Sequence, residues 1–311
     1  MKVIIAGTGA MGATYGANLA LANNDVQFLD GWDKNIEAIK SHGLKIHNVD
    51  KDEVLNVPIC KPEEYEGHAD LIIVFTKSMQ LDRMMQSIQH LIDENTSVLC
   101  LLNGLGHIDT LKKYVDEKNI LMGVTVLTAG MKGPGEFATS AHGKTEIQNI
   151  GKGGEEKAKL VAKTLSDATL PCEYSTNIMF SIWRKACLNG TMNANCAILD
   201  CNMRKLGMIP NTDHVLHKIV EEFAMVAKVE GVMLDVEEIY NYVMFFVSDK
   251  FSGVDHYPSM HQDLITHTRN TEIDYLNGYV ARKAKEHGLD APYCDLITYY
   301  VHGREIVLQG K

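Results

Sequence analysis

The sequence lacks a C-x-x-C pair, although it contains seven cysteines in 311 residues. An odd number of cysteines without paired spacing predicts reduced thiols, as in cytoplasmic proteins, and argues against a disulfide framework. Basic residues are also in deficit, with 30 Lys and Arg against 40 Asp and Glu and a formal net charge of −10. This balance argues against nucleic acid or an anionic membrane surface as a partner, because both select basic surfaces.

Long apolar runs and paired histidines are missing as well. No apolar stretch reaches the roughly 20 residues of a membrane span, and the apolar run at Val3–Ala6 leaves no room for a basic leader before it. The histidines of the tightest group, His256, His261 and His267, do not have the i, i+4 spacing of a helical metal site. We therefore expect a cytoplasmic protein with no bound metal.

The apolar and helical patterns predict two domains. From residue 2 to about residue 175, short β-rich runs alternate with helical patterns, which is typical of a doubly wound α/β sheet. The expected strands are Val3–Ala6, Val26–Asp30, Leu71–Thr76, Ser97–Leu102 and Ile120–Val126. Two more, Gly135–Ala138 and Lys144–Ile150, are expected to form a small antiparallel pair around a turn at Gly143, followed by a helix over Gly151–Ala168.

Helical periodicity dominates the rest of the chain. The expected helices are Ile178–Leu199, His214–Glu230, Val236–Asp249 and Thr271–His287. No repeat, low-complexity tract or long linker interrupts the sequence. We therefore predict a dinucleotide-binding domain over residues 1–175 and a mainly helical domain over residues 176–311.

A glycine motif follows the first expected strand and opens a helix. Its residues are Gly7, Thr8, Gly9, Ala10, Met11 and Gly12. In this context G-x-G-x-x-G is typical of dinucleotide binding: the first glycine permits a tight turn, the second lets the backbone approach a pyrophosphate, and the third lets the helix pack on the strand. The amino terminus of the helix favours the negative charge of the phosphates.

Polar residues at the ends of three expected strands extend this prediction. Asp30, about 20 residues past the glycines, is placed to accept hydrogen bonds from the adenosine ribose, which favours NAD over NADP. Lys77 and Asn103 follow two other strands and are assigned to the cofactor, near the phosphate or ribose and near the nicotinamide respectively. The alternatives are a turn aspartate, a helix cap or a solvated charge.

Lys185, Asn189 and Asn193 recur every fourth residue and line one face of an expected helix. Their neighbours on that face are apolar, and a polar line in a dry wall is costly unless it has partners or a function. Together with Glu272, expected to open a helix, these residues suit hydride transfer from nicotinamide to a carbonyl, with Lys185 donating the proton. An exposed lysine and a first-turn glutamate that complements the helix dipole are the alternatives.

Five blocks of the sequence together resemble the ketopantoate reductase family. They are Gly7–Gly12, Asn103–Gly106, Trp183–Lys185 with Asn189 and Asn193, Ser259–Asp263, and Thr271–Gly278. They cover nearly the whole chain in order, which is far more specific than the glycine motif alone. The resemblance implies a Rossmann domain joined to a helical domain of the 6-phosphogluconate dehydrogenase carboxyl-terminal type, and reduction of a 2-oxo acid to a D-hydroxy acid.

The resemblance also implies roles for single residues. Lys185 looks like the general acid, and Lys77 and Asn103 look like cofactor contacts. The residues that look like substrate-binding or orienting groups are Asn189, Asn193, Ser259 and Glu272.

Two departures from the family pattern refine the prediction. Asp30 stands where members that use NADPH carry a basic residue, and the stretch from Asp263 to Glu272 is one residue longer than usual, which affects the pocket wall next to Ser259. The chain therefore looks closest to the NAD-dependent branch, the D-2-hydroxyacid dehydrogenases resembling D-mandelate dehydrogenase. That branch acts on bulky or C3-branched 2-oxo acids.

Two alternatives remain at this stage. One is a 2-dehydropantoate 2-reductase of pantothenate biosynthesis, and the other is a non-catalytic NAD(H)-binding sensor, which would not need a proton donor. A homodimer is also expected from an aromatic helical surface, although such residues are more often core than interface. That surface comprises Tyr240, Tyr242, Phe245 and Phe246.

Overall fold

The computed structural model describes residues 1–48, 52–140 and 143–310. The chain divides into two compact units. Unit 1 comprises Met1–Leu102 and His107–Ile178, and unit 2 comprises Asn103–Gly106 and Met179–Lys311. The sequence predicted a single boundary near residue 176, whereas the structure also assigns the short segment Asn103–Gly106 to the helical unit.

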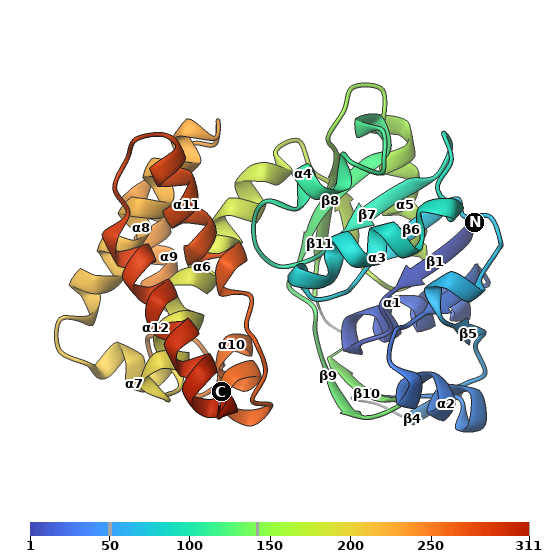
Figure 1. Cartoon of the computed structure of the whole chain (residues 1–311), viewed down its shortest axis with the longest axis horizontal. Coiled ribbons are helices and arrows are strands. Elements are labelled where there is room, and N and C mark those ends of the chain that lie inside the picture. The colour runs from blue at the N-terminus through green and yellow to red at the C-terminus, as the bar shows by residue number, and fades with distance from the viewer. Residues whose placement is uncertain (49–51, 141–142, 311) are drawn as a thin grey trace. The chain divides into compact units, whose positions relative to one another are not determined.

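Unit 1 is built on an eight-stranded sheet with the order β12-β11-β8-β7-β6-β1-β2-β5 (Figure 1). Its strands are β1 (Lys2–Ala6), β2 (Asp25–Leu29), β5 (Ile59–Cys60), β6 (Leu71–Val74), β7 (Ser97–Cys100), β8 (Ile120–Thr125), β11 (Thr145–Asn149) and β12 (Cys172–Tyr174). All neighbours pair in parallel except β8 and β11. The apolar runs of β1, β6 and β7 are almost wholly buried, as expected for parallel strands covered on both faces. The Rossmann-like α/β class is confirmed, and so are the first five of the seven strands predicted for this domain.

Helices cover this sheet. They are α1 (Ala10–Leu21), α2 (Asp33–His42), α3 (Leu81–Ser87), α4 (His107–Leu111) and α5 (Glu155–Asp167), with short 3₁₀ turns η1 (Pro62–Glu64), η2 (Ser78–Gln80), η3 (Gln89–Leu91) and η4 (Glu117–Asn119). Helix α1 packs on β1 and β2, and α5 packs on β11 and β12. The core between them includes the fully buried side chains of Ile5, Tyr15 and Phe28.

A second sheet of unit 1, with the order β4-β3-β10-β9, corrects one prediction. Its strands are β3 (Leu44–His47), β4 (Asp52–Leu55), β9 (Thr128–Gly133) and β10 (Glu136–Ser140). The expected pairing of Gly135–Ala138 with Lys144–Ile150 is wrong, because β10 pairs with β9 and β3 whereas β11 pairs with β8 and β12 in the main sheet. The tight turn is at Gly135, whose φ of +73° suits glycine.

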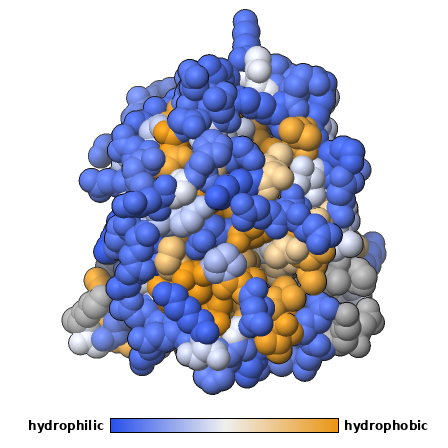
Figure 2. Space-filling view, turned by 90° about the vertical axis from the view of Figure 1, so that its right-hand side faces the viewer, coloured by the Kyte–Doolittle hydropathy of each residue, from blue (hydrophilic) through white to orange (hydrophobic). Residues whose placement is uncertain are grey.

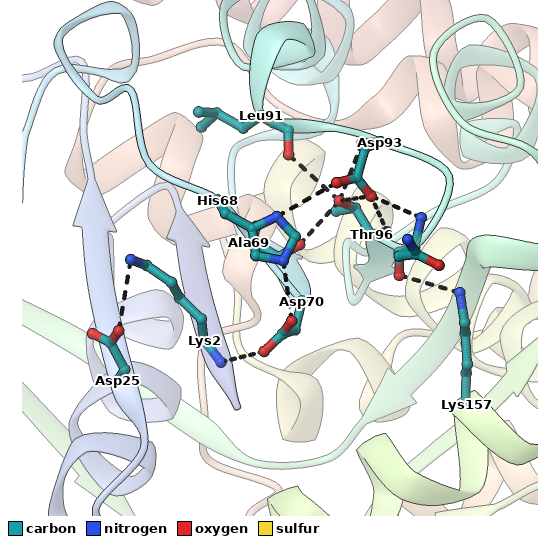
Figure 3. A network of polar contacts seen from close by, with 10 residues as sticks. Lys2, Asp25, His68, Ala69, Asp70, Leu91, Asp93, Thr96 and Lys157 are labelled. Atoms are coloured by element: carbon teal, nitrogen blue, oxygen red, sulfur yellow. Dashed lines mark hydrogen bonds and ion pairs between the residues drawn. The ribbon is translucent and has the colours of Figure 1, made fainter.

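Charged residues form a network of polar contacts at the edge of the main sheet where the parallel strands begin (Figure 3). The backbone N–H of Lys2 donates to Oδ2 of Asp70 at 2.7 Å, and His68 lies between Asp70 and Asp93, with nitrogen-to-oxygen distances of 3.2 and 3.4 Å. Asp93 accepts a hydrogen bond from the backbone of Asn95 at 2.7 Å. The backbone donors Lys2 and Asn95 hold the pKa of Asp70 and of Asp93, respectively, below the usual value. The opposite edge, where the strands end, carries the predicted nucleotide-binding residues.

One side of unit 1 carries β5 and α2, at the right of Figure 1. This side faces the viewer in Figure 2, where hydrophobic side chains gather in the lower half among hydrophilic ones. A hollow of about 460 Å³ lies between β5 and α2 and is lined by Gln27, Ile39, Lys40, Asn56, Val57, Pro58, Ile59 and Cys60. None of the predicted site residues lines this hollow.

Unit 2 is helical. Its elements are α6 (Ile178–Leu199), α7 (Met203–Met208), α8 (Thr212–Val229), α9 (Val236–Phe246), α10 (Ser259–His261), a π turn η5 (Gln262–Thr266), a 3₁₀ turn η6 (Ile273–Tyr275), α11 (Asn277–Glu286) and α12 (Pro292–Gln309). The predicted helix Thr271–His287 is wrong in its first turns, because the backbone at Leu276 (φ −120°, ψ −104°) is not helical and α11 begins only at Asn277. Among the residues described, no helix is long and apolar enough to span a membrane.

Candidate active site

The glycine loop of unit 1 joins the end of β1 to the start of α1. Gly7 has a φ of +104°, and a Cβ on it would lie 2.9 Å from the backbone carbon of Phe75. A Cβ on Gly12 would lie 2.0 Å from the carbonyl oxygen of Gly7, so helix and loop touch there. A Cβ on Gly9 would meet nothing within 4 Å, so the loop is open at that position. The three glycines thus have the three distinct geometries that the motif requires.

The amino terminus of α1 suits an anion. Its N-cap is Gly9, which has no side chain to cap the helix, and no acidic residue lies in the first turn. The half-buried residues Ala10 and Met11 form that turn. The first backbone N–H groups of a helix have no acceptor within the helix, so they favour phosphate oxygens.

Asp30 lies directly after β2, half-buried, with both carboxylate oxygens engaged. Oδ1 accepts a hydrogen bond from the backbone N–H of Trp32 at 2.9 Å, and Oδ2 accepts one from Nδ2 of Asn35 at 2.7 Å. Burial raises the pKa of Asp30, and these two donors oppose that rise. Lys34, the basic residue nearest to Asp30 in the sequence, is exposed.

Asn35 is a site residue that the sequence analysis missed. It lies in the first turn of α2 with 0% of its surface exposed. Besides Asp30, its Nδ2 donates to the carbonyl oxygen of Thr8 at 3.0 Å, and its Oδ1 accepts from the backbone N–H of Gly135 at 2.8 Å. A polar residue on the buried face that also carries Ile36 and Ile39 was the available signal.

Lys77 also belongs to unit 1. It is half-buried and follows β6, where it is the N-cap of η2. Because β6 neighbours β1, its carboxyl end lies at the same edge of the sheet as the glycine loop. Lys77 thus occupies a helix-capping position, although its side chain makes no capping hydrogen bond, and its assignment to the cofactor stays a prediction.

In unit 2, α6 carries the predicted polar line. Lys185 and Asn189 are half-buried and Asn193 is buried, while Ala186, Leu188 and Met192 nearby are buried. Nδ2 of Asn193 lies 3.4 Å from Oγ of Ser259, so the structure brings these two predicted residues together. The other two polar side chains extend the line towards the start of the helix.

Lys185 is the cation of this line, and its pKa is perturbed. Burial lowers the pKa of its ammonium to about 8, and the negative charge of Glu272 opposes the shift. Glu272 is half-buried and precedes η6, and its carbonyl oxygen accepts the backbone N–H of Tyr275 at 3.0 Å. It therefore caps a 3₁₀ turn, and the prediction that it opens an α-helix is wrong.

Asn103 starts the short segment that belongs to unit 2. The backbone N–H of Leu105 donates to the carbonyl oxygen of Tyr275 at 2.8 Å, and a Cβ on Gly104 would lie 2.7 Å from that oxygen. The segment therefore packs on the turn that follows Glu272. Asn103 is half-buried and lies two residues before this contact.

A π turn follows Ser259, where the stretch predicted to be one residue longer than usual begins. The N–H of His267 donates to the carbonyl oxygen of Gln262, five residues earlier, at 3.0 Å. Asp263 is buried and accepts a hydrogen bond from Nε of Arg269 at 2.8 Å. A π turn takes in one more residue than an α turn, so it is a local means of holding an extra residue beside Ser259.

Each unit thus carries one part of the predicted chemistry. Unit 1 offers an open glycine loop and a fixed carboxylate, which suit a dinucleotide. Unit 2 offers an ammonium whose pKa lies near neutrality beside a carboxylate and two amides, which suit proton donation to a carbonyl oxygen and binding of a polar substrate.

Two family models match the chain in succession. The first, described as "Ketopantoate reductase PanE/ApbA", matches residues 3–152. The second, described as "Ketopantoate reductase PanE/ApbA C terminal", matches residues 177–305. Together they cover both units.

Curated relatives and solved structures agree with these models. The 2-dehydropantoate 2-reductase of Lactococcus lactis subsp. lactis (strain IL1403) is 48% identical over 314 residues, covering 100% of both chains. The 2-dehydropantoate 2-reductase of Streptococcus pyogenes serotype M3 (strain ATCC BAA-595 / MGAS315) is 46% identical over 99% of both chains. A structure of D-mandelate dehydrogenase with NADH and anilino(oxo)acetate is 47% identical over 99% of both chains, with a TM-score of 0.95.

Proposed function

The chain belongs to the ketopantoate reductase family of NAD(P)-dependent oxidoreductases that act on CH–OH groups, and from this membership we propose that it interconverts 2-oxo acids and D-2-hydroxy acids with NAD(H). Its proposed substrates have bulky or C3-branched side chains. The observation that carries the proposal is Lys185, an ammonium with a pKa lowered to about 8 on a face otherwise lined by amides and apolar groups. A general acid works best when its pKa lies near the working pH.

The proposed mechanism is hydride transfer coupled to proton transfer. A bound NADH would supply the hydride for the carbonyl carbon, and Nζ of Lys185 would give its proton to the oxygen that becomes the hydroxyl. Glu272 keeps Lys185 charged in the resting state and orients the substrate. The amides of Asn189 and Asn193, with the hydroxyl of Ser259, bind the substrate's polar groups without adding charge.

The proposed cofactor site lies at the glycine loop and the ends of β2 and β6. Gly7, Gly9 and Gly12, with Ala10 and Met11, would hold the pyrophosphate, and Lys77 and Asn103 would contact other parts of the cofactor. Asp30 accepts hydrogen bonds from the ribose and repels a 2′-phosphate, so NAD is preferred over NADP. The D-mandelate dehydrogenase structure with NADH supports this preference.

A second candidate is the reduction of 2-dehydropantoate. It is favoured by the names of the relatives that are 46–48% identical, whereas the leading candidate is favoured by Asp30 and by the D-mandelate dehydrogenase structure. Both candidates use the same residues of unit 2. They differ in the acceptance of aromatic 2-oxo acids and in the cofactor.

A steady-state matrix separates them. We would measure kcat/KM for NADH and NADPH against ketopantoate, 2-ketoisovalerate and phenylglyoxylate. NADH preference with turnover of all three acids is the expected result. NADPH preference with turnover of ketopantoate alone would contradict both the proposed substrate range and the proposed role of Asp30.

The role of Lys185 has its own test. Lys185→Ala should lower turnover by about 10²- to 10⁴-fold, as is typical for loss of a general acid, while NADH binding is retained. NADH binding is followed by the fluorescence of the reduced cofactor. Oxidation of NADH at the full rate by the variant would contradict the mechanism.

We also propose that the protein is a cytoplasmic homodimer. Of the aromatic surface expected to pair, only Phe245 is exposed, and Tyr242 and Phe246 pack in ring contacts within unit 2. The larger exposed apolar row runs along α12 and comprises Leu296, Tyr299, Tyr300, Ile306, Val307 and Leu308. Sedimentation should give the mass of a dimer for the wild type and the mass of a monomer for Val307→Glu. An equal mass for the two proteins would contradict pairing through α12.

A further inference from the structure

We infer that Asn35 is a positioning residue for cofactor selection, because it fixes the carboxylate of Asp30 against the glycine loop. The inference rests on the proposed role of Asp30 in binding NAD. Nδ2 of Asn35 reaches Oδ2 of Asp30 at 2.7 Å and the carbonyl oxygen of Thr8 at 3.0 Å, and Oδ1 accepts from the backbone of Gly135 at 2.8 Å. One fully buried side chain therefore joins the end of β2, the glycine loop and the β9–β10 turn.

Only an amide side chain matches the hydrogen-bonding groups of the three partners. Two of them, the carbonyl of Thr8 and the carboxylate of Asp30, are acceptors, and the third, the N–H of Gly135, is a donor. An amide rotated by half a turn would point its oxygen at both acceptors. A carboxylate at the same position would do so as well, which is repulsive in a site closed to water.

The hydrogen bond from Asn35 orients the carboxylate and is among those that oppose the effect of burial on the pKa of Asp30. Its other oxygen is held by the backbone of Trp32, an exposed residue in the turn between β2 and α2. Without the donor from Asn35, burial favours the neutral carboxyl group, or the side chain turns towards solvent. Either change removes an acceptor from the ribose hydroxyls and lessens the repulsion of a 2′-phosphate.

A structural role alone would have a different signature. The hydrogen bonds of Asn35 with Thr8 and Gly135 support the glycine loop and the second sheet. Their loss therefore weakens the binding of NADH and of NADPH to the same extent. The contact with Asp30 concerns the one position at which NAD and NADP differ. The ratio of kcat/KM for NADH to that for NADPH therefore isolates the positioning role.

The experiment compares Asn35→Ala and Asn35→Asp with a matched control, Asn119→Ala. Asn119 is also buried in unit 1, donates to the carbonyl of Glu94 at 2.8 Å and accepts from Lys157 at 2.9 Å, at the opposite edge of the sheet. Both Asn35 variants should lower the NADH-to-NADPH ratio about tenfold or more through a rise in KM for NADH, with a much smaller change in kcat. The control should leave the ratio unchanged. If Asn35→Ala does not fold, Asn35→Ser keeps one hydroxyl donor and is measured in the same way.

Two further variants separate this inference from the proposed function. An unchanged ratio in Asp30→Ala would remove the proposed role of Asp30 itself. An unchanged ratio in the Asn35 variants, beside a changed one in Asp30→Ala, would overturn the inference about Asn35 alone. In the double variant Asp30→Ala/Asn35→Ala, the ratio should equal that of Asp30→Ala, because Asn35 then has no carboxylate to position. A further tenfold fall would also overturn the inference.

Discussion

Replacing Lys185 with methionine should inactivate the enzyme and make it more stable at neutral pH. The methionine keeps most of the aliphatic volume of the lysine on α6 and removes its charge. Burial lowers the pKa of Lys185 from the ordinary 10.5 to about 8, so the folded protein holds the charged form at a cost. Catalytic groups placed in apolar surroundings commonly have this cost in stability.

The size of the gain follows from that shift. A change of about 2.5 units, at about 1.36 kcal/mol per unit, corresponds to about 3 kcal/mol, which is an upper limit because Lys185 is only half-buried. Between about pH 8 and 10.5 the unfolded chain keeps a proton on Lys185 that the folded chain has lost, so the stability of the wild type rises with pH there. The advantage of Lys185→Met should thus be full below about pH 8 and absent above about pH 10.5.

Urea unfolding measures this difference. Trp183 is buried in the same helix, and Trp32, the other tryptophan, is replaced by phenylalanine in both proteins so that fluorescence reports unit 2. Lys250→Met, at an exposed position, is the control and should change stability little at any pH. A variant that is no more stable than the wild type at neutral pH, or a difference that does not vary with pH, would refute the reasoning.

Three further predictions follow from the same geometry. Reduction by the wild type should slow as the pH rises through about 8, while oxidation of the hydroxy acid speeds up, because Lys185 must be protonated for one direction and neutral for the other; pH profiles of kcat in both directions check this. Gly9→Ala should keep the melting temperature of the wild type but raise the KM for NADH, because a Cβ there meets nothing within 4 Å. Gly12→Ala, whose Cβ would lie 2.0 Å from a backbone oxygen, should lose about 1–3 kcal/mol or more of stability in urea unfolding. Equal effects of the two substitutions would be inconsistent with the loop geometry. The pKa of Asp70 and that of Asp93 are lowered in the folded protein, so the two carboxylates stabilise it above their ordinary pKa of 3.8. This contribution is lost as the pH falls through the pKa values of the folded state. The double variant Asp70→Asn/Asp93→Asn should therefore lose less stability in acid than the wild type, as measured by urea unfolding at a series of pH values.

Local sequence patterns determined the elements whose period or motif is complete within a short stretch. The helix predicted over Ile178–Leu199 is confirmed at both ends. The glycine motif likewise has its predicted place between β1 and α1. The i, i+4 spacing of Lys185, Asn189 and Asn193 places them on one face of that helix by geometry alone.

Local patterns could not choose partners distant in sequence. Short β-rich runs predicted β10 and β11 as strands, but the turn between them led us to pair them with each other, although they belong to different sheets. Helical periodicity ran through Glu272, but backbone at Leu276 is bent where the segment Asn103–Gly106 packs on Tyr275. Tertiary contacts override propensity in such places.

The hydrogen-bond partners of Asn35 could not be predicted from the sequence for the same reason. It reaches Asp30 five residues away, Thr8 27 residues away and Gly135 100 residues away. The sequence alone determined that a dinucleotide loop, an acidic residue after β2 and a lysine with two amides on one helical face are present. Only the tertiary structure decided which buried groups hold the acidic residue and what burial does to the pKa of the lysine, because hydrogen bonds and desolvation depend on segments that the chain brings together from afar.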